Sequence, residues 1–266
     1  MIEPVISLGK KTVVAMVHLP ALPGSPDYDP EVGMNKILDA VMADLEALQS
    51  GGVDAVMFGN EFDRPYVLKA PPEGLASLAA VIGQVKSMIK VPFGVNYLWD
   101  PVATVALAVA TEADFGREIY TGLYASDMGL WAPDCAGAAR LRSSNGRPDL
   151  QMLFNINAEF ATSLDNRPLE IKAKSVVFSS KADVICVSGM MTGMSVDQAE
   201  LRKVRESIPE TPLLANTGVT IESVDKIFSV TDGCVIGSHL KHNGDTWNSV
   251  DPDRVRKFMD KVDDIS

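Results

Sequence analysis

Several features that mark particular classes of protein are scarce in this sequence of 266 residues. Its three cysteines, Cys135, Cys186 and Cys234, lie far apart without CxxC spacing, which argues against a disulfide framework or a zinc knuckle. With three histidines in all, two of them in the last loop, a His-based metal site is poorly supplied. We therefore expect buried thiols and no metal, with Mg²⁺ held by carboxylates and water as the open alternative.

Positive charge and long apolar runs are also scarce. The chain has 24 Lys and Arg against 35 Asp and Glu, a net charge of -11, whereas a nucleic-acid-binding surface needs clustered cations. No basic segment followed by an apolar core opens the chain, and the longest apolar run, around 102–110, is too short to span a bilayer. We expect a cytoplasmic protein with no nucleic-acid partner and no integral membrane segment.

What the sequence does contain is an alternation of strand-like runs with helix-length amphipathic segments, and hydrophobic residues make up 46% of it. The predicted strands are Thr12–His18, Val53–Phe58, Pro92–Asn96, Asp114–Tyr120, Gln151–Asn157, Asp183–Ser188, Pro212–Asn216 and Gly233–Ser238. Eight such units in about 250 residues are typical of a (β/α)₈ barrel. The α/β prediction is thus a single-domain TIM barrel over residues 1–266, and we expect it to form a homo-oligomer.

A two-strand period supports closure of the barrel. Every second strand is entered through Asp, at Asp54, Asp114, Asp183 and Asp232. The intervening strands end in Asn96, Asn155 and Asn216, and His18 closes the first strand. Because alternate strands of a barrel contribute to the same layer, the three amides are expected to line one rim.

In a TIM barrel the chemistry lies at the carboxyl ends of the strands, where the βα loops form the pocket. The candidate catalytic residues there are His18, Glu61, Arg117, Glu118 and Asp127. Polar groups in such a pocket can shift one another's pKa and so supply one acid and one base. Arg117 and Glu118 adjoin within a strand, so we expect only one of them to face the interior. Solvated loop charges at Glu61 and Asp127, and a core histidine at His18, are the open alternatives.

Other polar residues near the rim suit a polyhydroxylated ligand, because amides both donate and accept hydrogen bonds. The candidate substrate-binding residues are Asn60, Asn96, Asn155, Asn216, Thr192 and Lys241. Strands seven and eight end in glycine-containing turns, which expose backbone N–H groups, and a short helix after Ser238 would direct its positive end to the same place. The candidate phosphate-binding residues are Gly193, Gly218, Gly237 and Ser238. Ordinary tight turns are the alternative for these glycines.

Two familiar mechanisms lack their sequence signals. A Schiff-base aldolase needs a desolvated Lys on a barrel strand, and none of the eight predicted strands contains Lys. No GxSxG motif precedes a helix, which argues against a serine hydrolase of that type. Acid–base chemistry by the carboxylates and His18 is what remains.

Several motifs resemble the BtpA/SgcQ family. They are "MVHLPALPGSP", "REIYTGLYASDMGLW", "SGMMTG", "NTGVT" and "VIGSHLKHNGDTWNSVDPDRV", and the second is more similar to the SgcQ branch. The resemblance covers nearly the whole chain and implies a TIM-like barrel. It links the BtpA branch with photosystem I biogenesis and the SgcQ branch with a nucleosidase label in sugar-utilisation clusters. Around strand five the BtpA branch carries Asp and a Lys-His pair, whereas this chain has Asn155, Glu159 and Phe160, so no role transfers there.

Two functions from different classes follow. The first is a cytoplasmic enzyme acting on a phosphorylated sugar or nucleoside, by C–N or C–C cleavage or by isomerisation. The second is a non-catalytic assembly factor of the BtpA type that binds a partner protein. A polar, charge-bearing pocket would favour the enzyme, and a broad exposed apolar patch would favour the assembly factor.

Overall fold

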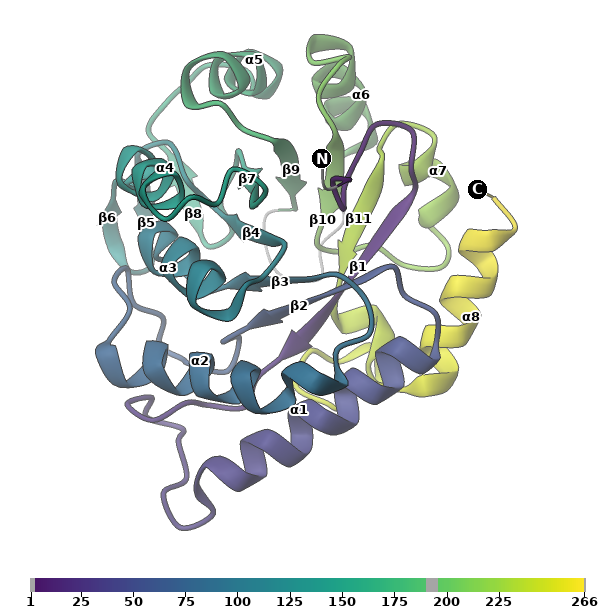
Figure 1. Cartoon of the computed structure of the whole chain (residues 1–266). Coiled ribbons are helices and arrows are strands. Elements are labelled where there is room, and N and C mark those ends of the chain that lie inside the picture. Colours follow the sequence, from purple (N-terminus) through teal and green to yellow (C-terminus); the bar gives the residue numbers. More distant parts are fainter. Residues whose placement is uncertain (1–2, 190–195, 266) are drawn as a thin grey trace.

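Eight parallel strands close into a barrel in the computed structural model, which describes residues 3–189 and 196–265 (Figure 1). In the order in which they pair around the barrel they are β1 (Thr12–His18), β11 (Gly233–Ile236), β10 (Leu213–Asn216), β9 (Val184–Ser188), β7 (Gln151–Asn155), β4 (Phe115–Glu118), β3 (Phe93–Asn96) and β2 (Ala55–Gly59). The predicted (β/α)₈ barrel is confirmed.

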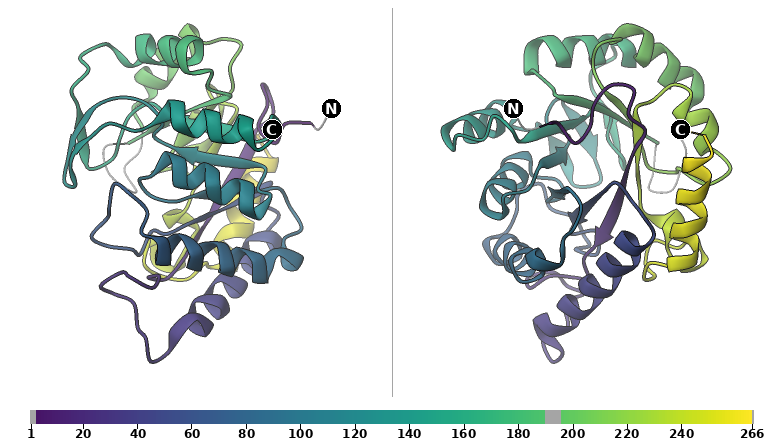
Figure 2. Two further views of the ribbon diagram at one scale, coloured as in Figure 1. Left: turned by 60° about the vertical axis from the view of Figure 1, so that its left-hand side comes forward. Right: turned by 45° about the vertical axis from the view of Figure 1, so that its right-hand side comes forward.

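Helices surround the barrel and cover the outer faces of its strands, as the two views of Figure 2 show. The α-helices are α1 (Gly33–Ser50), α2 (Pro72–Val85), α3 (Pro101–Thr111), α4 (Cys135–Ser144), α5 (Leu169–Ser180), α6 (Gln198–Ser207), α7 (Val224–Phe228) and α8 (Pro252–Asp263). Three short 3-10 helices are η1 (Lys86–Met88), η2 (Ser238–Leu240) and η3 (His242–Gly244). Asp side chains accept backbone N–H groups at the first turn of several helices, as Asp100 does for α3 and Asp251 for α8.

Strand alternation divides the core into two parts. Along β1, Val14 and Met16 face the barrel interior, and Val13, Ala15 and Val17 pack against the helices. The amino-terminal segment closes the interior from below, where Ile6 is buried among the interior side chains and its backbone exchanges two hydrogen bonds with the side chain of Gln151. The interior is therefore filled at the amino ends of the strands, among the described residues, and a pocket opens at their carboxyl ends.

The Asp residues that recur before alternate strands have a common role. Each accepts the backbone N–H near the start of a neighbouring strand: Asp54 from Val13 at 2.8 Å, Asp114 from Phe93 at 2.9 Å, Asp183 from Met152 at 2.8 Å and Asp232 from Leu213 at 2.9 Å. A side-chain oxygen thus replaces a strand carbonyl at the lower rim. The strands that follow these Asp residues accordingly begin later than the sequence pattern predicts, except for β11.

A small antiparallel sheet stands beside the carboxyl end of the barrel and was not predicted. Its strands, in the order β6 (Gly129–Trp131), β5 (Tyr124–Ser126) and β8 (Ala161–Ser163), come from the loops that follow β4 and β7. One face buries Tyr124 and Trp131, so residues of opposite parity, such as Leu130, are exposed. Strands of three residues are too short to give a clear alternating pattern, which explains why the sequence reads as a loop here.

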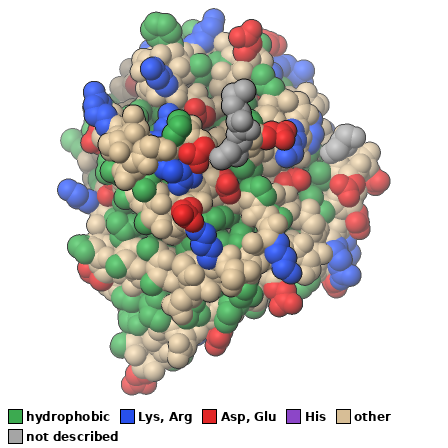
Figure 3. Space-filling view, in the orientation of Figure 1, with side chains coloured by type: hydrophobic (Ala, Val, Ile, Leu, Met, Phe, Trp, Pro, Cys, Tyr) green, Lys and Arg blue, Asp and Glu red, His purple; other side chains and the backbone are tan. Residues whose placement is uncertain are grey.

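Charged side chains of both signs are mixed over the face of the molecule that Figure 3 shows. The described residues on this face present no continuous basic area. No helix in the described ranges combines the length and the apolar character needed to cross a bilayer. Both termini lie on the same side of the molecule in the left view of Figure 2.

Candidate functional site

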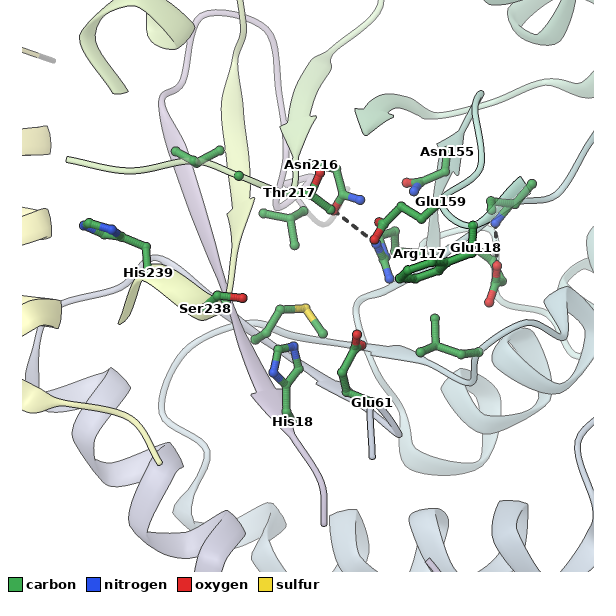
Figure 4. Close-up of a pocket in the computed structure, with 18 of the residues that line it drawn as sticks. His18, Glu61, Arg117, Glu118, Asn155, Glu159, Asn216, Thr217, Ser238 and His239 are labelled. Atoms are coloured by element: carbon green, nitrogen blue, oxygen red, sulfur yellow. Dashed lines mark hydrogen bonds between the residues drawn. The ribbon is translucent and has the colours of Figure 1, made fainter. Parts of the chain in front are cut away.

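The carboxyl ends of the barrel strands open into a pocket, whose lining is shown in Figure 4. Interior-facing side chains at the strand ends form its floor, because each lies two residues after a residue of the interior core. By this alternation His18 follows Met16 on β1, and Asn155 follows Leu153 on β7. Every second strand of the barrel, β1, β3, β7 and β10, therefore ends in a polar side chain, and these side chains form a layer directly above the apolar interior.

Arg117 crosses this floor and joins two of the amides. It is 8% exposed; its Nη1 donates to Oδ1 of Asn216 at 3.1 Å, and its Nη2 donates to Oδ1 of Asn96. Asn96 in turn donates to Oε1 of Glu118 at 2.8 Å. One guanidinium thus links the consecutive strands β3 and β4 with β10, which lies far along the chain.

The other side of the floor is organised by Ser188, the last residue of β9. Its Oγ accepts hydrogen bonds from Nδ2 of Asn155 at 2.9 Å and from Nδ2 of Asn216 at 2.7 Å. The structure thus brings Asn96, Asn155 and Asn216 together at one rim. Because Ser188 accepts two N–H groups, its own hydroxyl hydrogen is available to another acceptor.

Arg117 and Glu118 both reach the pocket, which differs from the expectation that only one would do so. The alternation rule itself holds, since Arg117 shares the interior face with Phe115. Glu118, however, is the last residue of β4, and its carboxylate turns back over the rim to accept the N–H of Ile119 at 2.6 Å. A strand-end residue is not bound by the alternation that holds within the strand.

The carboxyl groups of the pocket have altered acidities. Burial, together with the nearby charge of Glu159, raises the pKa of Glu61 to about 7, while Arg117 and Lys241 oppose the shift. Burial also raises the pKa of Glu118 to about 8, against the effect of Arg117. Figure 4 shows Glu61 and Glu159 directed toward the same part of the pocket. A carboxyl group with a pKa near 7 can act as either acid or base at neutral pH.

His18 lines the same pocket as these carboxyl groups and has a buried ring. Burial holds its pKa well below the ordinary value, and the charges of Lys241 and Arg117 act in the same direction. It is therefore a neutral imidazole at pH 7, able to donate from one ring nitrogen and accept at the other.

The ends of β10 and β11 form the opposite wall. Thr217 and Gly218 follow β10 with positive φ angles of 72° and 62°, and both line the pocket together with Gly237, Ser238 and His239. The expected short helix is η2, which begins at Ser238. The hydroxyl of Ser238 pairs with that of Thr246 at 2.5 Å.

An apolar wall faces this turn. Leu98, Trp99 and Ile119 line the pocket and belong to a buried cluster that extends to Trp131 beneath the small sheet. The rings of Trp99 and Trp131 meet edge to face, with centroids 5.6 Å apart. The small sheet therefore supports one side of the pocket.

Four buried polar atoms, each in a residue that lines the pocket, have no hydrogen-bond partner in the described part of the chain. They are Nδ1 of His18, Nε1 of Trp99, Nε of Arg117 and Oδ1 of Asn155. A buried polar group without a partner costs about 1–3 kcal/mol, so several of them around one cavity make it a candidate binding site.

Three candidate residues lie away from this site. Asn60 is occupied by loop contacts, donating to Asp63 in its own loop and accepting the N–H of Leu98, from the loop after β3, at 2.8 Å. Lys241 is buried against Asn248 and Asp44, and Asp127 is exposed in the turn between β5 and β6. None of the three lines the pocket. The candidates Thr192 and Gly193 lie outside the described residues.

Glu159 and Trp99 are among the residues lining the pocket to which sequence reasoning assigned no role. Glu159 follows β7 by four residues and is buried, and a carboxylate soon after a barrel strand was the available signal. Trp99 comes from the loop after β3 and carries no comparable signal. In the described ranges, no group of three His, Cys, Asp or Glu side chains is placed to hold a metal ion.

Comparison with known proteins gives a consistent result. The model of the BtpA family matches residues 9–264. SgcQ, an sgc region protein of Escherichia coli K12, is 49% identical over 256 residues, covering 96% of each chain. The photosystem I biogenesis protein BtpA of Synechocystis is 25% identical, covering 94% of this chain and 87% of its own.

A solved structure with the same fold is (S)-3-O-geranylgeranylglyceryl phosphate synthase from Thermoplasma acidophilum, in complex with its substrate sn-glycerol-1-phosphate. It superimposes with a TM-score of 0.56 at 14% identity, covering 97% of this chain and 95% of the other. At this identity the likeness concerns the fold.

Proposed function

The chain belongs to the BtpA family, and we propose that it is an enzyme acting on a phosphorylated sugar or nucleoside by acid–base chemistry. The observation that carries the proposal is that four residues lining the pocket at the carboxyl ends of the strands each have a buried polar atom without a partner among the described residues. A surface that only binds another protein has no need of such atoms inside a barrel. A polyhydroxylated ligand supplies both donors and acceptors to them.

The acid–base groups are Glu61 and His18. Glu61 has a pKa of about 7, which suits proton transfer at neutral pH, and the neutral ring of His18 lines the same pocket. The phosphate is assigned to the turns after β10 and β11, at Gly218, Gly237 and Ser238. Backbone and hydroxyl donors can hold a phosphate without cationic side chains, which suits this acidic protein.

A ligand screen tests the proposal. Thermal unfolding of the full chain would be followed with sugar phosphates, nucleoside monophosphates and inorganic phosphate, each beside its unphosphorylated counterpart. A ligand present at 100 times its Kd stabilises the native state by about 2.7 kcal/mol, so binding is readily detected. We expect stabilisation by at least one phosphorylated compound and less by its counterpart; no stabilisation by any of them would reject the proposal.

One observation favours the second candidate function, a partner-binding role of the BtpA type. The outward face of the small sheet exposes Leu123 by 45%, Leu130 by 73% and Leu164 by 50%. Leu123 and Leu164 are joined by a backbone hydrogen bond of 2.8 Å, so the exposed side chains are close neighbours. Exposed apolar groups of this kind occur at protein interaction sites.

Complementation of a strain that lacks the gene separates the two functions. If the protein acts as an enzyme, Glu61→Gln fails to restore the lost phenotype and Leu130→Asp succeeds. If it acts as an assembly factor, the outcome is reversed. Both variants would first be shown to melt near the wild-type temperature.

A further inference from the structure

The guanidinium of Arg117 is buried at the pocket floor, and no described carboxylate is hydrogen-bonded to it. In the described part of the chain its two acceptors, Oδ1 of Asn96 and Oδ1 of Asn216, belong to neutral amides, and its Nε has no partner. Burying a charge is costly unless an opposite charge or strong hydrogen bonds compensate it. The described residues thus give this cation no hydrogen-bonded counter-ion, although its charge acts on the carboxyl groups of Glu61 and Glu118, and its side chain lines the pocket.

The two amides fix the orientation of this cation. Asn96 is held by Glu118 at 2.8 Å, and Asn216 is held by Ser188 at 2.7 Å. Their oxygens therefore keep the guanidinium across the barrel, with its remaining N–H groups in a set position. Donors fixed in advance at a site of developing negative charge are a major source of transition-state stabilisation.

The positive charge of Arg117 favours one of the two proposed kinds of reaction, glycosidic cleavage and isomerisation, over the other. Cleavage of a glycosidic C–N bond develops positive charge on the sugar, because its transition state resembles an oxocarbenium ion. Removal of a proton from the carbon beside a carbonyl develops negative charge on the carbonyl oxygen. A fixed cation at the floor opposes the first reaction and assists the second.

Resting on the proposed function, we propose that the substrate is a phosphorylated hydroxy-aldehyde or hydroxy-ketone, and that Arg117 binds the carbonyl oxygen that becomes an enediolate oxygen. The Glu61 carboxylate takes the proton from the adjacent carbon. The C–H electron pair forms the new C=C bond, and the carbonyl π pair moves to the oxygen bound by Arg117.

Completion of the isomerisation needs only proton transfers. Glu61 returns its proton to the former carbonyl carbon, and the proton of the neighbouring hydroxyl moves between the two oxygens through His18. Aldose and ketose are thereby exchanged with no oxidant, reductant or co-reactant. The neutral state of His18 suits this transfer, because the ring has one donor and one acceptor nitrogen.

Proton exchange with solvent detects the first step. The full chain would be incubated in D₂O with aldose and ketose phosphates of three to six carbons, and deuterium at the carbon beside the carbonyl would be measured by NMR. Nucleoside 5′-monophosphates would be assayed in parallel for release of the free base. We expect deuterium incorporation in a sugar phosphate and no release of base.

The possible results separate this inference from the proposed function. If calorimetry shows that a sugar phosphate binds but no deuterium enters it, the inference is wrong and the proposed function stands. Release of the free base from a nucleoside monophosphate, without deuterium exchange in any sugar phosphate, would likewise contradict the inference and leave the proposed function standing. If no phosphorylated compound binds at all, both are rejected.

Charged analogues test the role of Arg117 directly. A phosphorylated hydroxamate imitates the enediolate, and a phosphorylated iminosugar of the same carbon number imitates the oxocarbenium ion. We expect the wild type to prefer the hydroxamate, and Arg117→Met to weaken hydroxamate binding by roughly 10- to 100-fold while leaving or improving iminosugar binding. Arg117→Lys, which keeps the charge but loses the planar donor pattern, should lie between them.

Arg205→Met is the matched control. Arg205 is also largely buried with an unpartnered Nε, but it is paired with Asp232 and lies outside the pocket. Its loss should lower the melting temperature without changing the ratio of the two analogue affinities. An unchanged ratio in Arg117→Met as well, or a wild-type preference for the iminosugar, would overturn the inference.

Discussion

Gly237 lies directly against the imidazole of His18. A Cβ atom at position 237 would come within 2.8 Å of Cε1 and 3.2 Å of Nε2 of that ring, both closer than ordinary contact. The ring is 7% exposed and cannot easily turn away. Glycine at the end of the last barrel strand therefore leaves room for the ring of His18, and it also allows a ligand to approach the backbone.

Replacement of Gly237 by Val should consequently disturb the acid–base group. We expect Gly237→Val to reduce turnover by at least tenfold and to weaken both phosphorylated and unphosphorylated ligands, because the displaced ring lines the shared pocket; the phosphorylated form should lose more, because it also loses its approach to the turn. Calorimetric titration with both ligand forms measures this. A loss confined to the phosphorylated form would mean that His18 adapts and that Gly237 acts on the phosphate alone.

Ser238 offers a cleaner test of phosphate binding. Its hydroxyl pairs with Thr246 at 2.5 Å and lines the pocket, so Ser238→Ala removes a donor without adding bulk. A hydrogen bond to a charged group contributes about 1.5–3 kcal/mol, so the phosphorylated ligand should bind roughly 10- to 100-fold more weakly. The unphosphorylated form should be unaffected. Thr246→Val, which removes the partner and keeps the Ser238 hydroxyl, is the control and should bind both forms nearly as the wild type does.

Glu61→Gln should abolish turnover and leave the fold intact. The amide keeps the size of the side chain and cannot take up a proton, and burial already penalises the charged form of Glu61. We expect activity on the true substrate to fall by at least a hundredfold, with a melting temperature equal to or slightly above that of the wild type. Single-turnover assays and thermal melts at pH 7.5 measure both. Retained activity would remove Glu61 from the mechanism.

The pH dependence of stability should report the buried carboxyl group of Glu118. Its pKa is raised from 4.5 to about 8 in the folded chain, so its contribution to stability is complete below about pH 4.5 and is lost as the pH rises through 8. The free energy of unfolding of Glu118→Gln should therefore rise relative to that of the wild type as the pH increases over this interval, by at most about 1.4 kcal/mol per pH unit. Urea unfolding between pH 5 and 8 measures the difference. Glu112→Gln, at a fully exposed carboxylate, should give a constant difference over the same interval, and a constant difference for Glu118→Gln would contradict the assignment.

The barrel and its polar layer could be predicted because both follow from the period of the strands. Asn96, Asn155 and Asn216 end alternate strands, and the register of a closed barrel brings such positions to one level. The lower rim is equally regular, with Asp54 and Asp114 in equivalent positions. Equivalent positions in alternate strands carry the same residue types, and this repeat can be seen in the sequence.

The loop residues of the site could not be predicted in this way, because loops have no strand period. Asn60 and Lys241 have the same polar character as true pocket residues, yet loop hydrogen bonds occupy them. Glu159 and Trp99 reach the pocket because the small sheet and its aromatic cluster shape the loops, and strands of three residues leave no pattern. Whether a polar loop residue serves the fold or a ligand depends on partners that are distant in sequence.

Lys241 illustrates this choice and yields a decisive prediction. It is 1% exposed, donates to the carbonyl of Asn248 at 2.9 Å, and lies 3.7 Å from Oδ2 of Asp44, whose Oδ1 accepts the N–H of Val250 at 2.8 Å. Removing one member of a buried ion pair costs about 3–5 kcal/mol, because the other charge is left uncompensated. Lys241→Met should therefore lower the free energy of unfolding by that amount, with ligand affinity retained at temperatures where the variant is folded. Adding Asp44→Asn, which removes the stranded charge and keeps an acceptor for Val250, should recover much of the loss. Urea unfolding and calorimetric titration of the single and double variants measure stability and ligand affinity. If Lys241→Met had normal stability but had lost ligand affinity, Lys241 would instead be a substrate-binding residue. It would then reach the ligand from the loop that its ion pair with Asp44 otherwise holds in place.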